Sequence, residues 1–295
     1  MTVLIIASTK DPASVNIKKN LLKQSSWEEI DEFYENVVYR HSNMKDIVMV
    51  TINDRKITHE NLDKEVEEKL GIKPKQAIFI SRHTSKTGKP TLTAHPIGNY
   101  GVAQFGGEDR ILPESSPRLM TYLLRILKKN AKQADLYHQV CFEVTHHGPY
   151  ISIPSLFVEV GSTKEEWEKE EPANIVAKSV LELLESYHYE SDLPSDIPVL
   201  IGIGGGHYAP RFTDVVLEKK AAFGHMVPTY QIKAGNFTET TLDQVIQKTP
   251  NASVGYFHRK ALKKSQMREF KTWFEQRDIP MISSKELQDL TLETL

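Results

Sequence analysis

The sequence contains very little cysteine, since Cys141 is its only thiol among 295 residues. A single cysteine excludes an intrachain disulfide and any zinc site built from several thiolates. Long apolar runs are also absent, because no stretch approaches the roughly 20 residues that a membrane-spanning helix needs. The first residues show no basic segment followed by a hydrophobic signal sequence. We therefore expect a cytoplasmic protein that does not associate with a membrane.

A large excess of charge of either sign is absent as well, because 37 basic residues stand against 39 acidic ones. The protein thus lacks a uniform basic field that would hold a nucleic acid. Charge is nevertheless uneven along the chain. Residues 73–132 carry eleven basic side chains against three acidic ones, and residues 259–277 carry seven against two. Such blocks indicate either solvated helix faces or one basic side that contacts a polyanion.

The sequence does contain alternating short apolar runs and amphipathic stretches, which are typical of an α/β fold with a mainly parallel sheet covered on both faces. Strands are predicted at residues 3–7, 48–52, 77–81, 92–95, 140–145, 156–160, 199–203, 222–226, 254–257 and 281–283. Helices are predicted at residues 12–22, 61–70, 117–130, 172–187, 212–219, 241–248 and 265–277. No repeat or linker divides the chain. We expect a monomer with a single α/β domain over residues 1–295 and an irregular insertion at 82–113 near the active site.

Histidine carries the strongest functional signal, because six of the 11 histidines lie beside apolar runs in segments rich in Gly, Pro, Thr or Glu. Ligands of open α/β sheets gather beyond the carboxyl ends of the strands, where loops from distant positions converge. We therefore expect one sheet edge to collect these imidazoles. The alternative for any single one is a hydrogen-bonded structural histidine. The six are His83, His95, His146, His147, His207 and His225.

The most specific of these segments is FEVTHHGP, residues 142–149. If its strand extends through residue 145, Glu143 and His147 share one face and His146 lies on the other. Two imidazoles beside a carboxylate suit zinc or another divalent ion. They also suit metal-free acid–base catalysis in which the glutamate orients a histidine. A polar cluster that only satisfies backbone groups at the strand end is the remaining interpretation.

A second segment, IGIGGGHYAPRFT at residues 201–213, runs from a buried strand through three glycines into a helix. Successive glycines allow backbone N–H groups to approach an anion closely, although a simple tight turn has the same composition. The segment matches neither the dinucleotide fingerprint nor a phosphate-binding P-loop. The chain also has no G-x-S-x-G nucleophile elbow, and Cys141 lies within an apolar run. By elimination, we expect water to be the nucleophile.

Four segments, in this order and spacing, resemble the D-aminoacyl-tRNA deacylases of the archaeal and plant type. They are SRHTSKTGKPTLTAHPIGN, FEVTHHGPYISIPSLFVEVGST, IGIGGGHYAPRFT and AFGHM, and they span about residues 80–230. The resemblance implies hydrolysis of the ester that joins a D-amino acid to the 3′ end of tRNA, with zinc as cofactor. It also implies a three-layer α/β/α fold with a mixed, mainly parallel sheet, related to phosphorylases and zinc exopeptidases.

The residues and the resemblance together predict three sets of site residues. The metal ligands are expected among His83, His95, His146, His147, His207 and His225. The catalytic set is Glu143, as general base or as a residue that orients one, with His147 and with Tyr208 near the oxyanion. The set that binds D-aminoacyl-tRNA is Arg82, Asn99, Gly204, Gly205, Gly206 and a basic stripe opposite the apolar face of helix 117–130, made of Arg118, Arg125, Lys129 and Lys132.

Two alternative functions stay open at this stage. The first is another zinc-dependent peptidase or amidohydrolase that acts on small substrates and has no salt-sensitive affinity for tRNA. The second is a non-catalytic tRNA-binding module whose histidines are structural. Deacylation of D- and L-tyrosyl-tRNA, with and without a chelator, separates both from the deacylase.

Overall fold

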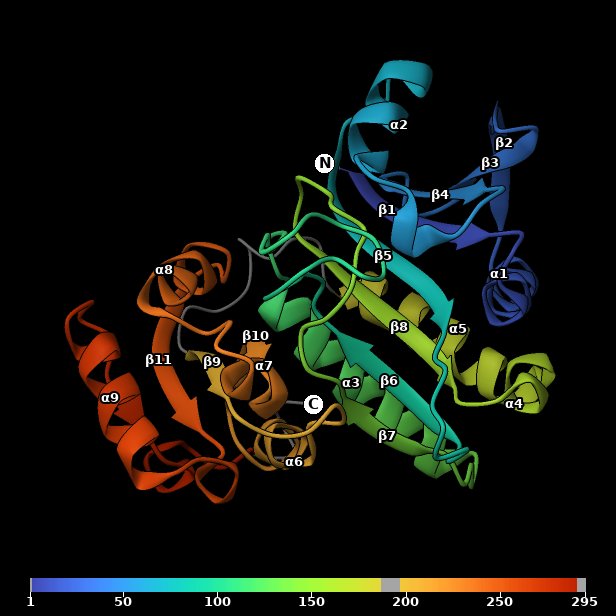
Figure 1. Cartoon of the computed structure of the whole chain (residues 1–295). Coiled ribbons are helices and arrows are strands. Elements are labelled where there is room, and N and C mark those ends of the chain that lie inside the picture. Colours follow the sequence, from blue (N-terminus) through green and yellow to red (C-terminus); the bar gives the residue numbers. More distant parts are fainter. Residues whose placement is uncertain (1, 187–196, 291–295) are drawn as a thin grey trace.

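The computed structural model describes residues 2–186 and 197–290, and within them the strands form two sheets (Figure 1). The larger sheet consists of β1 (Thr2–Ser8), β2 (Trp27–Phe33), β3 (Asn36–His41), β4 (Ile47–Ile52), β5 (Pro74–Arg82), β6 (Thr91–His95), β7 (Gln139–Phe142) and β8 (Ser155–Gly161). Their order in the sheet is β2-β3-β4-β1-β5-β8-β6-β7. The smaller sheet has the order β10-β9-β11-β12 and consists of β9 (Val199–Ile203), β10 (Ala222–Val227), β11 (Ala252–Phe257) and β12 (Met281–Ile282).

Strand direction differs between the two sheets. In the larger sheet, β4, β1, β5 and β8 are parallel, whereas β6 runs antiparallel to β8 and the β2–β3 hairpin is antiparallel at the opposite edge. All pairs of the smaller sheet are parallel. The large sheet is therefore mixed but mainly parallel, as the sequence predicts.

Helices lie between and around the strands. They are α1 (Pro12–Gln24), α2 (Leu62–Leu70), α3 (Pro117–Gln133), α4 (Lys164–Glu168), α5 (Glu170–Ser186), α6 (Pro210–Glu218), α7 (Thr229–Lys233), α8 (Glu239–Gln247) and α9 (Lys264–Glu275). Short 3₁₀ turns include η1 (Lys56–Thr58), η3 (Arg259–Ala261) and η4 (Ser284–Glu286). In the described part of the chain, no helix has the length and apolar character that crossing a membrane requires.

Side-chain alternation along the buried strands separates the two faces of the larger sheet. On β1, Val3, Ile5 and Ala7 belong to the core that contains α1, α3 and α5. Leu4 and Ile6 belong to a second core on the opposite face, which contains α2. Both faces of β1 are thus apolar, which explains why this strand appears in the sequence as a continuous hydrophobic run. The result is the expected arrangement of helices on both sides of a sheet.

The predicted elements are present, with small differences at their ends. The strand expected at 140–145 ends at Phe142, and Tyr187, the last residue of the helix expected at 172–187, lies outside the described residues. The β2–β3 hairpin was not predicted, because its half-exposed β2 mixes acidic residues with few apolar ones. The division of the strands into two sheets was not predicted either. Local periodicity identifies strands but not the partners with which they pair.

Helix α3 packs against both sheets, and this position contradicts part of the predicted basic stripe. Arg118 and Arg125 are only 4% and 3% exposed. The Arg125 guanidinium donates hydrogen bonds to the backbone carbonyls of Val216, Lys219 and Ala221, at 2.8, 2.9 and 3.2 Å. These carbonyls belong to the end of α6 and to the segment that leads into β10. The prediction that Arg118 and Arg125 face solvent is wrong, because α3 is covered on the side opposite its apolar stripe too.

Replacing Arg125 by methionine tests this structural role. The three carbonyls would keep their burial but lose a charged donor, so we expect the free energy of unfolding to fall by about 2–4 kcal/mol. Lys129→Met on the same helix is the matched control, since Lys129 forms an exposed ion pair with Glu182 and should contribute less than about 1 kcal/mol. Urea unfolding of both variants measures the difference. Equal stability of the two variants would contradict the assigned role of Arg125.

Candidate active site

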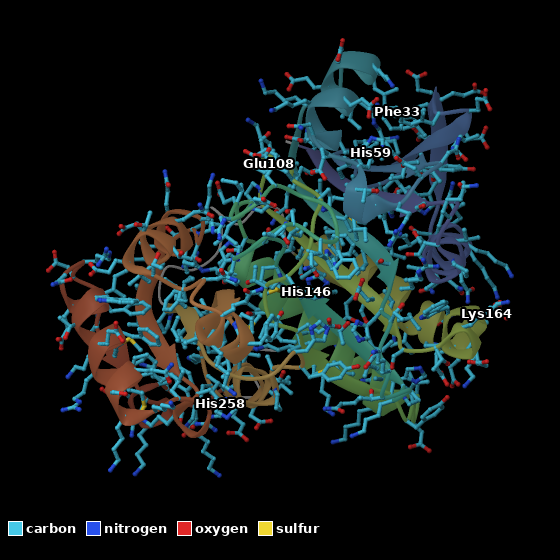
Figure 2. All side chains as sticks on the ribbon, in the orientation of Figure 1. Phe33, His59, Glu108, His146, Lys164 and His258 are labelled. Carbon is cyan, nitrogen blue, oxygen red and sulfur yellow. The ribbon has the colours of Figure 1, made fainter. Side chains whose placement is uncertain are left out.

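The site lies where one face of the larger sheet meets the carboxyl edge of the smaller sheet, near His146 in Figure 2. The backbone makes this junction directly: the N–H of Val144 donates to the carbonyl of His207, and the N–H of Ala209 donates to that of Phe142, both at 3.0 Å. Residue 142 is the last of β7, and residues 143–144 follow it. This segment therefore pairs with residues 207–209, which follow β9. Two segments about 65 residues apart are joined like neighbouring strands.

The larger sheet supplies His83, His95 and Glu159 from one face. His95 is level with Phe157, and Ser81 is level with Glu159 across β8. Because side chains alternate along a strand, His83, His95 and Glu159 all project on the same side of the sheet. This arrangement corrects the expectation that a single carboxyl edge collects the histidines. Strand β6 runs opposite to β5, so their carboxyl ends point in opposite directions, and the residues meet over the face of the sheet.

Glu159 is a site residue that the sequence analysis did not identify. It is 3% exposed and is the only charged residue of β8, a strand in which every residue is buried. Its carboxylate lies 3.4 Å from Nδ1 of His83 and 3.7 Å from Nε2 of His95. The signal was available, because a lone carboxylate within an apolar strand is costly to bury without a partner. Its partners, however, lie on other strands.

The two adjacent histidines enter the site together, contrary to the predicted alternation. Strand β7 ends at Phe142, and His147 has a positive φ of 44°. The chain therefore turns after Glu143, and the rings of His146 and His147 lie only 4.4 Å apart. The ring of His146 is also 4.2 Å from that of His95 and 4.5 Å from that of His207. One compact group of imidazoles results.

Glu143 stands at the centre of this group and is fully buried. Its Oε1 lies 3.1 Å from Nδ1 of His83, and its Oε2 lies 2.8 Å from Nε2 of His207 and 3.5 Å from Nε2 of His146. The other ring nitrogen of His83 is 3.0 Å from the hydroxyl of Tyr208. A chain of polar contacts thus links Glu143 through His83 to Tyr208. Glu143, His207 and Tyr208 come from the paired segments at the junction.

Mutual compensation sets the charge states of the buried groups. Burial alone would raise the pKa of Glu143, but His207 and His83 together hold it well below its usual range. Burial likewise opposes ionisation of Glu159, whose pKa is nevertheless lowered to about 2 by His83 and His95. The same pairs act in reverse on the imidazoles. Although burial lowers it, the pKa of His83 rises to about 11 beside the two carboxylates.

Burial, nearby carboxylates and neighbouring imidazoles together shift the pKa values of His95, His146 and His147. Burial works against a charge on His95, yet the nearby Glu159 raises its pKa. Burial lowers the pKa of His146 well below its usual value and that of His147 to about 4, and the charge on His95 adds to both effects. At neutral pH, the two carboxylates are therefore ionised and His83 is an imidazolium, while Glu159 favours the charged form of His95. His146 and His147 stay neutral and retain a lone pair.

Three sets of three side chains are close enough to hold a metal ion, and one of them is His95, Glu143 and Glu159 at the buried side of the cluster; the other two each include at least two histidines. Of these two, the first is His95, His146 and His147, and the second is His83, Glu143 and His207, with the ligand atoms of each set within 4.8 Å of one another. In the first set, Nδ1 of every histidine faces a backbone carbonyl: that of Pro96, Val144 or Gly148, at 3.1, 2.8 and 2.6 Å. A carbonyl only accepts, so each Nδ1 donates. Nε2 of His146 and of His147 carries a lone pair for a ligand, and Nε2 of His95 gains one when it gives up the proton that Glu159 favours. Histidines that bind metals are oriented in this way.

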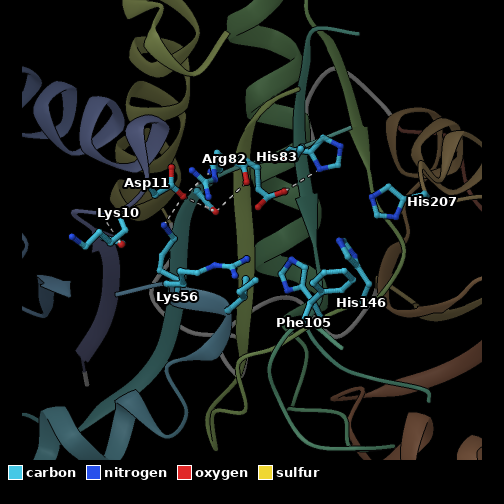
Figure 3. Close-up of a pocket in the computed structure, with 15 residues that line it drawn as sticks. Lys10, Asp11, Lys56, Arg82, His83, Phe105, His146 and His207 are labelled. Atoms are coloured by element: carbon cyan, nitrogen blue, oxygen red, sulfur yellow. Dashed lines mark hydrogen bonds and ion pairs between the residues drawn. The ribbon is translucent and has the colours of Figure 1, made fainter. Parts of the chain in front are cut away.

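Two cavities meet at the histidines, and Figure 3 shows the residues that line the first of them. The first has a volume of about 450 Å³ and extends toward Lys10, Asp11 and Lys56 on the β1 side. The second has a volume of about 530 Å³ and extends toward α7 and the loop after β6. Four residues line both cavities: Phe105, His146, His147 and His207. A molecule bound at the histidines therefore has room on each side of its reacting group.

A buried ion pair forms the far wall of the first cavity. Nζ of Lys56 lies 2.7 Å from Asp11, and both side chains are at most 9% exposed. Asp11 also caps α1 by accepting the N–H of Ser14, and it accepts the N–H of Arg82 at the end of β5. It thereby holds α1, η1 and the start of the His83 segment together. Lys56, like Glu159, was not predicted, because the surrounding sequence NDRKITH resembles an ordinary polar loop.

The structure places several other predicted residues differently. His225 is fully buried outside the cluster, where it contacts Thr145 at 3.1 Å and the carbonyl of Pro113 at 3.0 Å. It is a structural histidine and belongs to none of the three sets of potential ligands. The N–H groups of Gly204 and Gly205 already donate to the carbonyl of Val227 and the hydroxyl of Thr229. These two amides are therefore not available to bind an oxyanion.

The other predicted substrate residues lie at the cavities or on the surface. Arg82 lines the first cavity, and its guanidinium lies 5.0 Å from the centre of the Trp167 ring. Asn99 lines the second cavity and donates to the carbonyl of Gly106. Gly206 is exposed beside His207, whereas Lys132 is exposed on α3.

Comparison with known proteins gives one consistent result. Residues 70–282 match the family described as D-aminoacyl-tRNA deacylase. A D-aminoacyl-tRNA deacylase of Thermococcus onnurineus is 41% identical over 229 residues, which are 77% of this chain and 80% of the relative. One of Methanosarcina mazei is 34% identical over 295 residues, or 97% of this chain and 94% of the relative. A crystal structure of a conserved protein of unknown function, AF0625, has a TM-score of 0.87 at 30% identity and covers 98% of this chain and 99% of its own.

The buried His225 makes a prediction about stability and pH. Burial is the main cause that lowers its pKa to about 4, from an unfolded value near 6.5. Between these values the unfolded chain binds a proton that the folded protein does not, so stability falls as the pH falls. In His225→Gln, which keeps a donor and an acceptor, we expect this loss to be smaller by about 1.4 kcal/mol per pH unit near pH 5. Urea unfolding between pH 4.5 and 7 measures it, and an unchanged slope contradicts the assignment.

Proposed function

This chain belongs to the D-aminoacyl-tRNA deacylase family, and we propose that the cluster around Glu143 hydrolyses the ester between a D-amino acid and the 3′ end of tRNA. The observation that carries the proposal is the convergence of five imidazoles and two buried carboxylates at the junction of two cavities. The ester has two halves, an amino acid and a terminal nucleoside. A reacting carbonyl at the histidines leaves one cavity for each half.

Water is the nucleophile in this proposal, and His207 accepts its proton. Glu143 has too low a pKa to be an effective base by itself, since a general base works best with a pKa near the working pH. Its contact of 2.8 Å with Nε2 of His207 suits a different role. A small rotation of either side chain aligns this ion-pair contact as a hydrogen bond from Nε2–H of His207, which leaves Nδ1 to accept a proton from water. The imidazolium that forms is then stabilised by the carboxylate, as in the histidine–aspartate pair of a catalytic triad.

Tyr208 donates a hydrogen bond to the oxyanion that develops on the ester carbonyl. His83 is protonated, so both of its ring nitrogens donate, one to Glu143 and the other to the oxygen of Tyr208. The phenol O–H of Tyr208 is then free to point toward substrate. A donor that is held in place before the reaction is among the most effective means of stabilising such an intermediate. We propose the N–H of Gly206, an exposed residue, as the second donor. The amides of Gly204 and Gly205, which the sequence also predicted for this role, already donate elsewhere.

The residues present fit a bound zinc ion. His95, His146 and His147 converge, and their Nδ1 atoms donate to backbone carbonyls. A set of three histidines without a thiolate is a known ligand set of catalytic zinc. In the described part of the chain, Nε2 of His95 and both oxygens of Glu143 also lack a well-directed hydrogen bond. When bound there, zinc polarises the ester carbonyl and lowers the pKa of water to about 7. In this assignment His147 is a ligand, because its low pKa makes it a poor base.

Neither alternative function has comparable support. A peptidase or amidohydrolase for small substrates and a non-catalytic tRNA-binding module both remain outcomes of the experiments below. The matched relatives are named D-aminoacyl-tRNA deacylases, and the matches cover most of their length.

Glu143→Gln tests the proposed role of the central carboxylate. The variant keeps the shape of the side chain but no longer stabilises the imidazolium of His207, so we expect kcat for D-tyrosyl-tRNA to fall by about 10²-fold or more. Glu166→Gln is the matched control, because Glu166 is also buried and contacts a histidine, His138, at 3.0 Å outside the site. Steady-state deacylation rates compare the two. Similar activity of the two variants would contradict the mechanism.

Substrate chirality and metal dependence are tested with the wild-type protein and His147→Ala. We expect D-tyrosyl-tRNA to be hydrolysed faster than L-tyrosyl-tRNA by about 10⁴-fold, because a pocket shaped for one enantiomer leaves polar groups of the other unpaired. Exhaustive chelation should abolish the activity, zinc should restore it, and His147→Ala should respond only weakly to zinc. Full activity after chelation contradicts the metal assignment alone. Hydrolysis of N-acyl amino acids but not of D-tyrosyl-tRNA contradicts the function.

A further inference from the structure

A basic groove lies on the smaller sheet, away from the histidine cluster. It has a volume of about 630 Å³ and runs between α9 and the carboxyl ends of β11 and β12. Four cationic side chains line it, and Glu286 is its only acidic residue. All four are exposed to solvent. They are Arg259, Lys264, Arg268 and Lys271.

The cations of this groove are mostly not neutralised by neighbouring carboxylates. Lys271 forms an exposed ion pair with Glu275 at 3.4 Å, and Glu286 lies near Arg259. Among the described residues, Lys264 and Arg268 have no acidic side chain within ion-pair distance. The surrounding segment, residues 259–277, carries seven basic side chains and two acidic ones in a protein of net charge −2. Such a local excess attracts a polyanion even though the whole protein does not.

A short series of packing contacts connects the wall of the groove with the active site. Turn η3, which begins with Arg259, packs against the glycine turn that precedes His207: a Cβ on Gly205 would lie 3.3 Å from Nδ1 of His258. The hydroxyl of Thr229 contacts the carbonyl of Ala261 at 3.5 Å. Thr229 begins α7, and the next two residues of that helix line the second cavity. One path therefore leads from the groove over η3 and α7 to the histidines.

We propose that this groove binds the phosphodiester backbone of the tRNA acceptor end, an inference that rests on the proposed function. A chain with no overall basic charge needs a local surface of this kind, because phosphate contacts provide most of the affinity for nucleic acids. Helix α3 provides less of it, because Arg118 and Arg125 are buried and Lys129 is paired with Glu182, which leaves Lys128 and Lys132 as its exposed unpaired cations among the described residues. Lysine and arginine on α9 are exposed, and they lie on the side of the smaller sheet, which also supplies His207.

This direction of approach assigns one cavity to the terminal nucleoside and the other to the D-amino acid. A tRNA end that arrives over η3 and α7 reaches the cavity of about 530 Å³ first. Its lining includes the amides of Asn99, Gln104 and Gln231, which suit the hydrogen-bonding edges of a base, and the partly exposed rings of Phe105 and Tyr230, which suit stacking. The terminal nucleoside therefore occupies this cavity. The D-amino acid occupies the other, beside Glu159, Asp11 and Lys56.

Charge reversal of two groove residues tests the proposal. For Lys264→Glu/Arg268→Glu we expect KM for D-tyrosyl-tRNA to rise about tenfold or more at 0.1 M salt, with kcat unchanged. The slope of log affinity for uncharged tRNA against log salt should decrease by about 1–2, since each lost phosphate contact removes close to one unit. Fluorescence anisotropy measures the affinity. The matched control is Lys75→Glu/Lys128→Glu, which changes the net charge equally at exposed positions on β5 and α3.

A second substrate separates this proposal from the proposed function. The compound 3′-O-D-tyrosyl adenosine has the reacting ester and the terminal nucleoside but no phosphodiester, so both double variants should hydrolyse it at the wild-type rate. Loss of this activity in the groove variant would mean that the substitutions disturb the fold or the site, and would overturn the proposal. An unchanged KM and salt slope for tRNA would overturn it too. If wild-type protein hydrolyses neither substrate, the proposed function fails instead.

Discussion

Two carboxylates, Glu143 and Glu159, lie in the interior of this protein and stay ionised there because imidazoles surround them. An isolated buried carboxylate would take up a proton, since burial favours the neutral form. The pairing works in both directions, because the same carboxylates keep His83 and His95 charged. His146 and His147 have no carboxylate as close to them as His83 has, and they remain neutral. This division of charge decides which imidazoles donate hydrogen bonds and which have lone pairs for a metal.

The cluster depends on the junction of two sheets, so its geometry belongs to neither sheet alone. The larger sheet supplies His83, His95 and Glu159, and the smaller sheet supplies His207 through the segment that pairs with residues 142–144. Arg125 stabilises this junction from behind by binding three carbonyls of the smaller sheet's segments. A residue far from the reacting atoms thus takes part in positioning them. The same separation of elements places one cavity on each side of the histidines.

Charge is arranged so that substrate binding and chemistry use different parts of the molecule. In the catalytic cluster, the carboxylates of Glu143 and Glu159 face the imidazoles that they keep protonated, so these charges largely offset one another inside the protein. The exposed cations of α9 provide an attraction for a polyanion at the edge of the smaller sheet. Interactions between exposed charges are screened by salt, whereas buried pairs are screened much less. Binding of tRNA is therefore expected to depend on ionic strength more strongly than the chemical step does.

The sequence by itself determined the succession of strands and helices, the family, and the five histidines that meet in the site, which are among the six it proposed. These features are local: apolar periodicity identifies an element, and short motifs keep their residue types and spacing. It also indicated that thiolates play no part, because the chain has one cysteine. The half-exposed β2–β3 hairpin was missed because its local pattern is weak.

Only the tertiary structure decided which polar residues are functional. Helical periodicity placed Arg118 and Arg125 on one face of α3, but whether that face meets solvent depends on α6 and β10, about 90 residues away in the chain. Glu159 and Lys56 became site residues because their partners come from other strands and turns. His225, in a motif of the same kind as the others, became structural because its neighbours are Thr145 and Pro113. The physical reason is common to all five: burial and charge depend on what packs against a residue, and a local pattern does not contain its distant neighbours.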